Sequence, residues 1–257
     1  MDETEELMRL MGRASVVQMG HAPGFELHMT RGCFLALTGE PLADFNTAGI
    51  GRDPDASGFL SRAVARARER GLPLLAMMSP GVAEALTSVA SRLGLTAVGT
   101  APLMVLRAEV PVRSDGLDIQ VVRALGAELV EVAGDLVAAA FDAPRDAVGR
   151  GIDAGITETA GVEWYIASRD DVPMSVVCVT PSGTTAGVFS MGTPPEHQRK
   201  GMGRALLTRV IDDYRGRGVE RFYLVATEAG RSLYASLGFE AIADLSAWVL
   251  EQSRSEA

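Results

Sequence analysis

The second half of the chain switches between two hydrophobic spacings, one typical of strands and one typical of helices. Short runs rich in β-branched and aromatic residues predict strands, and turn-forming pieces separate them. Apolar residues three or four positions apart predict helices. In chain order, the predicted elements are a strand at 117–123, a helix around 129–137, strands at 162–168, 174–180 and 185–193, a helix at 202–215, a strand at 221–226, a short helix around 232–237 and a strand between 240 and 250. This order predicts an α+β fold in which helices flank a mixed central β-sheet.

The first half of the chain repeats the end of this order. An amphipathic helix is predicted over 59–67, a strand over 72–78 and a second helix over 82–93. The segment Ser91–Val98 aligns with Ala235–Ile242, and each contains a Leu-Gly pair after a predicted helix. We interpret the similarity as an internal duplication, so that both halves have the same kind of fold.

A linker-like segment separates the two halves. Proline, glycine and charged residues cluster between Glu109 and Gly116, which is typical of a connection between domains. The sequence therefore predicts two domains, at 1–110 and 111–257.

Composition narrows the classes of function. The 257 residues have a formal net charge of −9, which argues against nucleic-acid binding because phosphates require a basic surface. The two cysteines, Cys33 and Cys178, form no Cys-x-x-Cys pair, and His21 and His28 form no metal set with them, so no metal is predicted. Cys178 alternates with apolar neighbours and is expected to be a core thiol. An acidic first segment without a following apolar run predicts a cytoplasmic protein without a membrane anchor.

The strongest chemical motif is the segment Thr193–Leu206, which joins a predicted strand to a predicted helix. Gly201 and Gly203 let the backbone turn tightly and approach a ligand closely. The first amides of the helix then point outward without partners, and the helix dipole adds partial positive charge. Arg199, Lys200 and Arg204 add formal positive charge in an acidic half of the chain. The sequence here predicts an anion site suited to a pyrophosphate.

Together with a second motif, this segment resembles the GNAT superfamily of acyl-coenzyme A N-acyltransferases. Gln198-x-x-Gly201-x-Gly203 matches the superfamily's Gln/Arg-x-x-Gly-x-Gly/Ala loop, and the segment 233–239 matches its Leu-Tyr-x-x-x-Gly-Phe segment. The resemblance covers roughly residues 117–250.

The first half departs from the same pattern. Residues 49–55 lack the loop, and Ala90 stands at the position of Tyr234. The resemblance thus implies a tandem GNAT-like fold in which the N-terminal copy is degenerate and not catalytic.

The resemblance implies that acetyl-coenzyme A binds with its pyrophosphate on the amides of residues 201–205. Its pantetheine arm would add to the strand around residues 190–193 as an extra strand. Thr227 departs from the asparagine found in many members. The residues expected to contact the cofactor are Ser190, Met191, Thr193, Gln198, Arg199, Lys200, Gly201, Met202, Gly203, Arg204, Ala205 and Thr227.

For catalysis, the resemblance implies that Tyr234 is the general acid that protonates the departing thiolate. From the residues alone, a core tyrosine of the helix is an equal alternative. Glu163 is the first candidate for the general base, and Asp142 and Asp146 are alternatives. For each of the three, a solvated surface carboxylate is the competing interpretation. His197 flanks the loop and is interpreted as a solvated loop residue.

The leading hypothesis is an N-acetyltransferase that moves an acetyl group directly to a primary amine in a ternary complex. The acceptor would be a small molecule or a peptide, and the acidic second half favours a cationic amine. One alternative is an acyl-coenzyme A-binding sensor or interaction module without turnover. Another is a tandem enzyme whose degenerate half builds the acceptor pocket, as in mycothiol-synthase-like members. The sequence does not specify the acceptor, the acyl size or the oligomeric state, and it is compatible with a homodimer.

Overall fold

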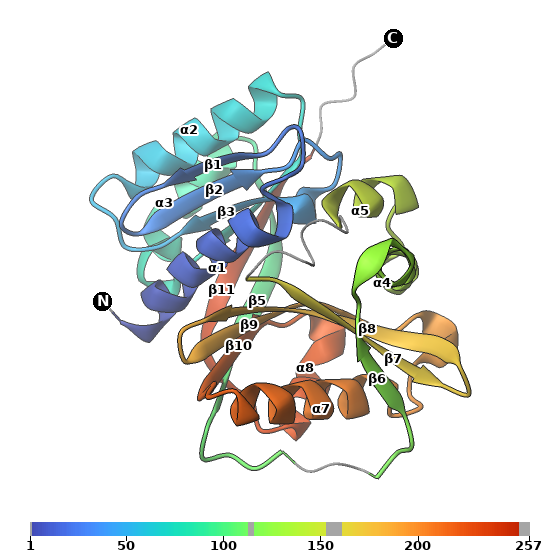
Figure 1. The fold of residues 1–257 in the computed structure, drawn as a ribbon. Coiled ribbons are helices and arrows are strands. Elements are labelled where there is room, and N and C mark those ends of the chain that lie inside the picture. Colours follow the sequence, from blue (N-terminus) through green and yellow to red (C-terminus); the bar gives the residue numbers. More distant parts are fainter. Residues whose placement is uncertain (1, 113–115, 153–160, 252–257) are drawn as a thin grey trace. The chain divides into compact units, whose positions relative to one another are not determined.

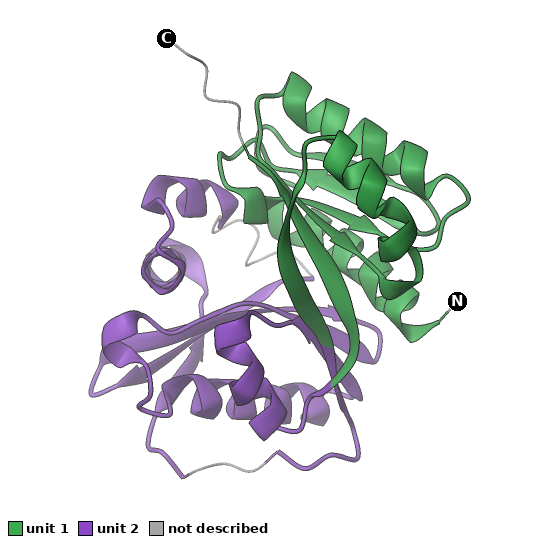
Figure 2. Cartoon of the chain, turned by 180° about the vertical axis from the view of Figure 1, so that it is seen from behind, with its two compact units in different colours: residues 1–103, 241–257 green, residues 104–240 purple. Residues whose placement is uncertain are grey.

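A computed structural model describes residues 2–112, 116–152 and 161–251 of the chain. The chain forms two compact units, shown in different colours in Figure 2. Unit 1 consists of residues 1–103 and 241–257, and unit 2 consists of residues 104–240. This division differs from the predicted domains, 1–110 and 111–257, most clearly at the last strand of the chain.

Unit 1 contains a five-stranded arrangement in the order β1-β2-β3-β4-β11. Strands β1, β2 and β3 are antiparallel, β3 and β4 are parallel, and β4 and β11 are antiparallel. The elements (Figure 1) are α1 (Glu3–Met19), β1 (Glu26–Met29), β2 (Cys33–Leu37), the 3₁₀ helix η1 (Ala43–Phe45), β3 (Asn46–Ile50), α2 (Ala56–Glu69), β4 (Leu74–Met78), α3 (Pro80–Arg92) and the first part of β5 (Thr96–Arg107), followed late in the chain by β11 (Glu240–Leu250).

The core of unit 1 explains why the hydrophobic spacing predicted its helices. The apolar stripe of α2 is buried together with residues of β2, β3, β4 and α3. The two predicted helices and the predicted strand at 72–78 are confirmed as α2, α3 and β4. Helix α1 covers the other face, where Gly12 lies against the Phe34 ring.

Unit 2 contains strands in the order β10-β9-β8-β7-β6. Strands β9 and β10 are parallel, and the other neighbours are antiparallel. The elements are β6 (Gln120–Arg123), α4 (Gly126–Phe141), α5 (Arg145–Gly151), β7 (Glu163–Arg169), β8 (Val172–Ser182), β9 (Thr185–Gly192), the 3₁₀ helix η2 (Pro195–His197), α7 (Met202–Gly216), β10 (Arg221–Val225) and α8 (Glu228–Ser236). Figure 1 shows α4 and α7 on opposite faces of this sheet. The predicted order of strands and helices is confirmed, with α5 as an addition.

Each unit is completed by a strand from the other half of the sequence. In unit 1, β11 pairs with β4 over five residue pairs, from Ser246↔Met78 to Leu250↔Leu74. The second part of β5, from Met104, belongs to unit 2, where β5 is the neighbour of β10 in the strand order. This exchange of last strands is the physical reason why the compact units differ from the predicted ranges.

Candidate active site

The parallel strands β9 and β10 separate after a short ladder. They pair only from Thr185↔Arg221 to Gly187↔Tyr223, whereas β9 continues to Gly192. On its other side, β9 has a bulge, because Val176 faces Gly192 while Cys178 faces Phe189. Ser190, inside this bulge, has a φ of 46°, which is unusual for a residue other than glycine. A bulge bends a strand, so the far end of β9 turns away from β10 and presents an edge without a ladder partner in β10.

Hydrogen bonds within unit 2 hold the segment that follows β9. The Ser175 hydroxyl, fully buried on β8, donates to the Gly192 carbonyl at 2.9 Å and lies 2.9 Å from Thr193 Oγ1. Gln198 Nε2 donates to the Thr193 carbonyl at 3.1 Å. Gln198, the first residue of the predicted pyrophosphate loop motif, therefore joins the two ends of the segment 193–198, and Ser175 of β8 holds the start of this segment through hydrogen bonds.

Gly201 and Gly203 of the loop are required for different structural reasons, one for its backbone conformation and the other for lack of space. Gly201 immediately precedes α7 with a φ of 81°, a conformation that side chains disfavour. Gly203 lies in the first turn, and a Cβ there would be 3.1 Å from Met191 Cε and 3.2 Å from Thr193 Oγ1. The end of β9 and the start of α7 thus meet at Gly203. Amides of this first turn lack acceptors within the helix and can bind an anion.

The charged residues of the loop differ in their surroundings. Arg199 and Lys200 are exposed beside the first turn of α7. Arg204 is directed to α8 instead, where Nη2 donates to Ser236 Oγ at 2.7 Å and lies 3.3 Å from its carbonyl. Its guanidinium therefore joins α7 to α8, and its contact with the cofactor stays a prediction. The backbone of Arg204 still belongs to the first helical turn.

Thr227 begins α8 as its N-cap. Its Oγ1 accepts from the Gly230 amide at 3.2 Å, which satisfies one free donor of the helix start. The hydroxyl proton stays available for a second partner. Thr227 thus caps the start of α8, at the position where many GNAT sequences have asparagine.

Tyr234 lies on α8 with only 8% of its surface exposed. Its ring meets Phe239 edge-on, with 5.9 Å between the ring centroids, and a Cβ on Gly230 would lie 2.9 Å from its Cε2. Burial raises the pKa of the Tyr234 hydroxyl to about 12. The group is therefore protonated at neutral pH, as a proton donor must be.

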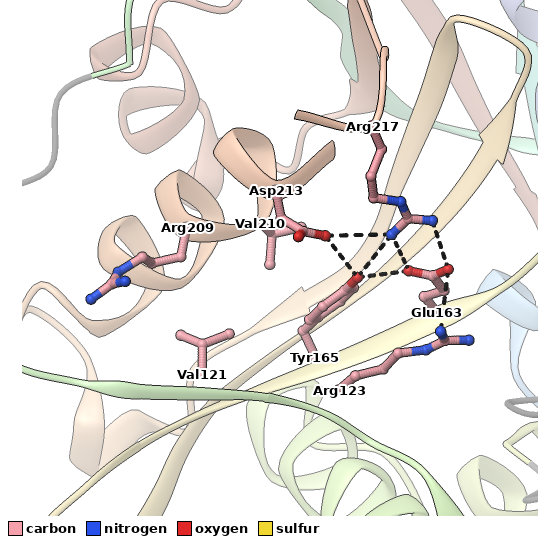
Figure 3. Close-up of a pocket in the computed structure, with 8 residues that line it drawn as sticks. All are labelled: Val121, Arg123, Glu163, Tyr165, Arg209, Val210, Asp213 and Arg217. Carbon is pink, nitrogen blue, oxygen red and sulfur yellow. Dashed lines mark hydrogen bonds and ion pairs between the residues drawn. The ribbon is translucent and has the colours of Figure 1, made fainter. Parts of the chain in front are cut away.

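Glu163, the predicted general base, is the centre of a hydrogen-bonded cluster on the α7 face of β7 (Figure 3). Arg217 donates to both of its oxygens, at 2.7 and 2.9 Å. The hydroxyls of Tyr165 and Tyr214 donate at 2.6 and 2.8 Å, and Arg123 lies 3.6 Å away. Burial alone would raise the pKa of Glu163, but the bonds from Arg217 and the two tyrosines outweigh it and lower the pKa to about 2.

These contacts argue against Glu163 as a base, because its lone pairs are taken and its proton affinity is low. The cluster borders a pocket of about 440 Å³, also lined by Val121, Arg209, Val210 and Asp213. The alternatives, Asp142 at the C-cap of α4 and Asp146 in the first turn of α5, are both exposed.

Two further expectations concern single residues. His197 is half-buried in η2, and its Nδ1 is shielded from solvent with no hydrogen-bond partner among the described residues, so it is less solvated than predicted. Cys178 is fully buried, as expected of a core thiol. The described part of the chain contains no group of three or more His, Cys, Asp or Glu residues suited to a metal, and none of its helices is long and apolar enough to cross a membrane.

Ser175 was not predicted from the sequence. Its only signal is a polar residue inside the otherwise apolar run from Met174 to Val179. The bulge at Ser190 could not be predicted from the sequence, because residues 185–193 have the pattern of a regular strand.

Comparisons with known proteins concern the family of residues 135–239 and the fold of the chain. Residues 135–239 match the family model described as the acetyltransferase (GNAT) family. The fold is similar to a GCN5-related N-acetyltransferase from Kribbella flavida, with a TM-score of 0.68 at 17% identity over 95% of both chains. It is also similar to a tandem GNAT protein from the clavulanic acid biosynthesis pathway, with a TM-score of 0.60 at 16% identity over 98% of this chain and 95% of that one.

A closer sequence similarity is short. The chain is 42% identical over 57 residues to the "[Ribosomal protein bS18]-alanine N-acetyltransferase" of Escherichia coli (strain K12). The match spans 21% of this chain and 38% of that relative.

Proposed function

Since residues 135–239 belong to the acetyltransferase (GNAT) family, we propose that this chain transfers an acetyl group from acetyl-coenzyme A to a primary amine. The amine attacks the bound thioester directly in a ternary complex. The observation that carries the proposal is the separation of β9 from β10, directly before the glycine loop and the first turn of α7.

The residues around this separation fit the two polar parts of the donor. The edge of β9 around Ser190 and Met191 suits the amides of the pantetheine arm. The amides of residues 201–205, with Arg199 and Lys200 beside them, suit the pyrophosphate. Thr193 and Gln198 hold the loop that connects the two. When bound, acetyl-coenzyme A supplies the activated acyl group and a thiolate leaving group.

Tyr234 is the proposed general acid, which gives its proton to the departing thiolate. A phenol is protonated at neutral pH even at its ordinary pKa, and burial raises the pKa of Tyr234 further. We expect Tyr234→Phe to lower kcat by roughly 100-fold, while the Kd for acetyl-coenzyme A changes less than about twofold. The measurements are thiol release for kcat and calorimetry for Kd.

The matched control is Tyr223→Phe, which removes the same hydroxyl from a buried tyrosine of β10. Its kcat should stay near that of the parent. Unchanged turnover in Tyr234→Phe would remove the assignment.

For the base, the geometry favours the end of α4 over β7. A Cβ on Gly192 would lie 2.7 Å from Ala140 Cβ and 3.2 Å from the Phe141 ring, so α4 ends against the last residue of β9. Asp142 follows directly. We therefore propose Asp142 in place of Glu163, whose carboxylate is held by four other side chains.

The proposed acceptor class rests on the name of a relative and on the composition of the chain. The Escherichia coli relative is named for acetylation of an alanine of a ribosomal protein, which makes a peptide N-terminus the first acceptor to test. The acidic composition also suits small cationic amines. The cytoplasm and a homodimer stay predictions.

The first experiment is thermal unfolding with and without acetyl-coenzyme A, with adenosine and pantetheine as controls. A ligand at about 100 times its Kd stabilises the folded state by about 2.7 kcal/mol, a shift of roughly 5–10 °C for a protein of this size. Thiol release with peptides and amines then separates an enzyme from a binding module without turnover. No shift at millimolar donor would contradict both functions.

A further inference from the structure

Unit 1 contains the same succession of elements as the proposed donor site of unit 2. The parallel pair β3 and β4, with α2 between them and α3 after them, corresponds to β9 and β10 with α7 and α8. Ser79 is the N-cap of α3, as Thr227 is the N-cap of α8. The two places can therefore be compared element by element.

The parallel strands β3 and β4 of unit 1 do not separate along their length. Their ladder runs from Thr47↔Leu75 to Ile50↔Met78, and the Ser79 amide extends it by donating to the Ile50 carbonyl at 2.9 Å. The pairing of β3 with β2 is regular along its length, and no residue of β3 has a positive φ. The edge that β9 offers beyond Gly187 is thus already paired in β3.

The end of β3 is also occupied by a side chain of unit 1 itself. Glu5 of α1 is 8% exposed, and both of its oxygens lie 3.0 Å from the Arg52 amide. Ser79 Oγ donates to Glu5 Oε1 at 3.0 Å. A Cβ on Gly51 would lie 2.0 Å from Glu5 Oε2, so only glycine leaves room for this carboxylate. A backbone amide and a hydroxyl at a helix start are the donors that an anionic ligand would otherwise use.

The loop that follows contains two carboxylates and one guanidinium, that of Arg52, which lies 3.7 Å from Asp2. Asp53 and Asp55 precede α2 where Arg199 and Lys200 precede α7. Asp53 Oδ1 accepts from the Asp55 amide at 3.0 Å, and Oδ2 lies 3.3 Å from the Gly32 amide. Carboxylates in the loop repel a polyphosphate.

From these contacts we infer that α1 acts as an internal ligand of unit 1, in which the Glu5 carboxylate fills the place of a bound anion, and that the whole chain binds one acyl-coenzyme A. The number of sites rests on the proposed function of unit 2. The role of Glu5 rests on unit 1 alone.

Calorimetry of the full chain with acetyl-coenzyme A tests the number of sites. We expect one site per chain, and Gly203→Val should abolish it because the added atoms meet Met191 and Thr193. Lys200→Glu, at an exposed position, should weaken the same site roughly tenfold without affecting folding. Two sites in the parent would overturn the inference while leaving the proposed function intact. One full site left in Gly203→Val would mean that the donor binds outside the loop of unit 2, which would contradict both the inference and the proposed function.

Glu5→Ala tests the internal ligand without any donor. Loss of the carboxylate leaves the Arg52 amide and the Ser79 hydroxyl without their acceptor, so we expect the melting temperature to fall by about 5 °C. Formate at high concentration should restore part of this loss, whereas equal chloride should not. Glu84→Ala, an exposed glutamate of α3, is the control and should melt like the parent.

An unchanged melting temperature in Glu5→Ala would overturn the internal ligand. If the parent bound no donor at all, the proposed function of unit 2 would fail, and the Glu5→Ala result would still decide the role of α1.

Discussion

At the scale of single residues, Ser175 shows how one buried hydroxyl can shape a binding site. It joins the last carbonyl of β9 to the first hydroxyl of the loop, although it lies on β8. The sequence motif covers the loop residues themselves but not this support. The reason is that a polar residue in an apolar strand has many structural uses, and only its neighbours in space distinguish them.

For Ser175→Ala we expect the free energy of unfolding to fall by about 1–2 kcal/mol, because the Gly192 carbonyl loses a buried donor. We also expect acetyl-coenzyme A to bind roughly fivefold more weakly, with kcat at saturation close to the parent's. Calorimetry and saturation kinetics measure the two effects. Ser182→Ala, at the exposed end of β8, should change neither. Equal losses in kcat and affinity would argue for a general loss of structure.

The hydrogen-bond partners of Glu163 could not be predicted from the sequence around it. The strand of Glu163 was predicted, but its burial was not, because its partners Tyr214 and Arg217 lie more than 50 positions away in the chain. A carboxylate on a strand beside a predicted site has the same sequence pattern whether it faces a substrate or an arginine.

At the scale of elements, the Glu163–Arg217 pair joins the start of β7 to the end of α7. A carboxyl whose pKa is lowered by folding stabilises the folded state above its ordinary pKa, and this stabilisation is lost as the pH falls toward the folded pKa. For Glu163 the ordinary value is 4.5 and the folded value is about 2.

Glu163→Gln should therefore cost about 2 kcal/mol at pH 7, since Arg217 is partly exposed and two tyrosines keep weaker acceptors. The difference from the parent should be constant down to about pH 5 and shrink between about pH 4.5 and 2. Urea unfolding at several pH values measures it. Glu220→Gln, an exposed residue of the same unit, serves as control. A difference that grew with acid would contradict the sign.

Elements with one buried face were predictable, and the others were not. Helices α2, α3 and α7 bury clear stripes at helical spacing, so their pattern is informative. The strand β2 is buried at all five positions, and such a run does not alternate. Helix α1 has buried positions on one face, but its polar residues and Gly12 weaken the pattern.

At the scale of the whole molecule, the sequence predicted the duplication but not the exchange of last strands. A hydrophobic pattern indicates that a strand exists, whereas its partner depends on residues far away in the chain. The exchange has a direct consequence for dissection of the protein at the predicted boundary.

Separate fragments 1–110 and 111–257 should each be poorly soluble, because β4 loses β11 in the first and β10 loses β5 in the second. Expressed together, they should co-purify through a tag on one fragment. Substitution of Ala247, which pairs with Met77, by proline should reduce this co-purification, while Ala241→Pro, before the paired stretch, should reduce it less. Two fragments that fold separately would contradict the exchange.

The exchanged strand also sets an order of events on the ribosome. Domains usually fold from the N-terminus as synthesis proceeds. Here residues 104–240 leave the exit tunnel before β11 does. All strands of unit 2 are therefore available for pairing while β4 of unit 1 still lacks its partner strand β11. The half of the protein that is translated first is therefore the half that is finished last. Until then, the nascent chain carries an open sheet edge that a chaperone would have to shield.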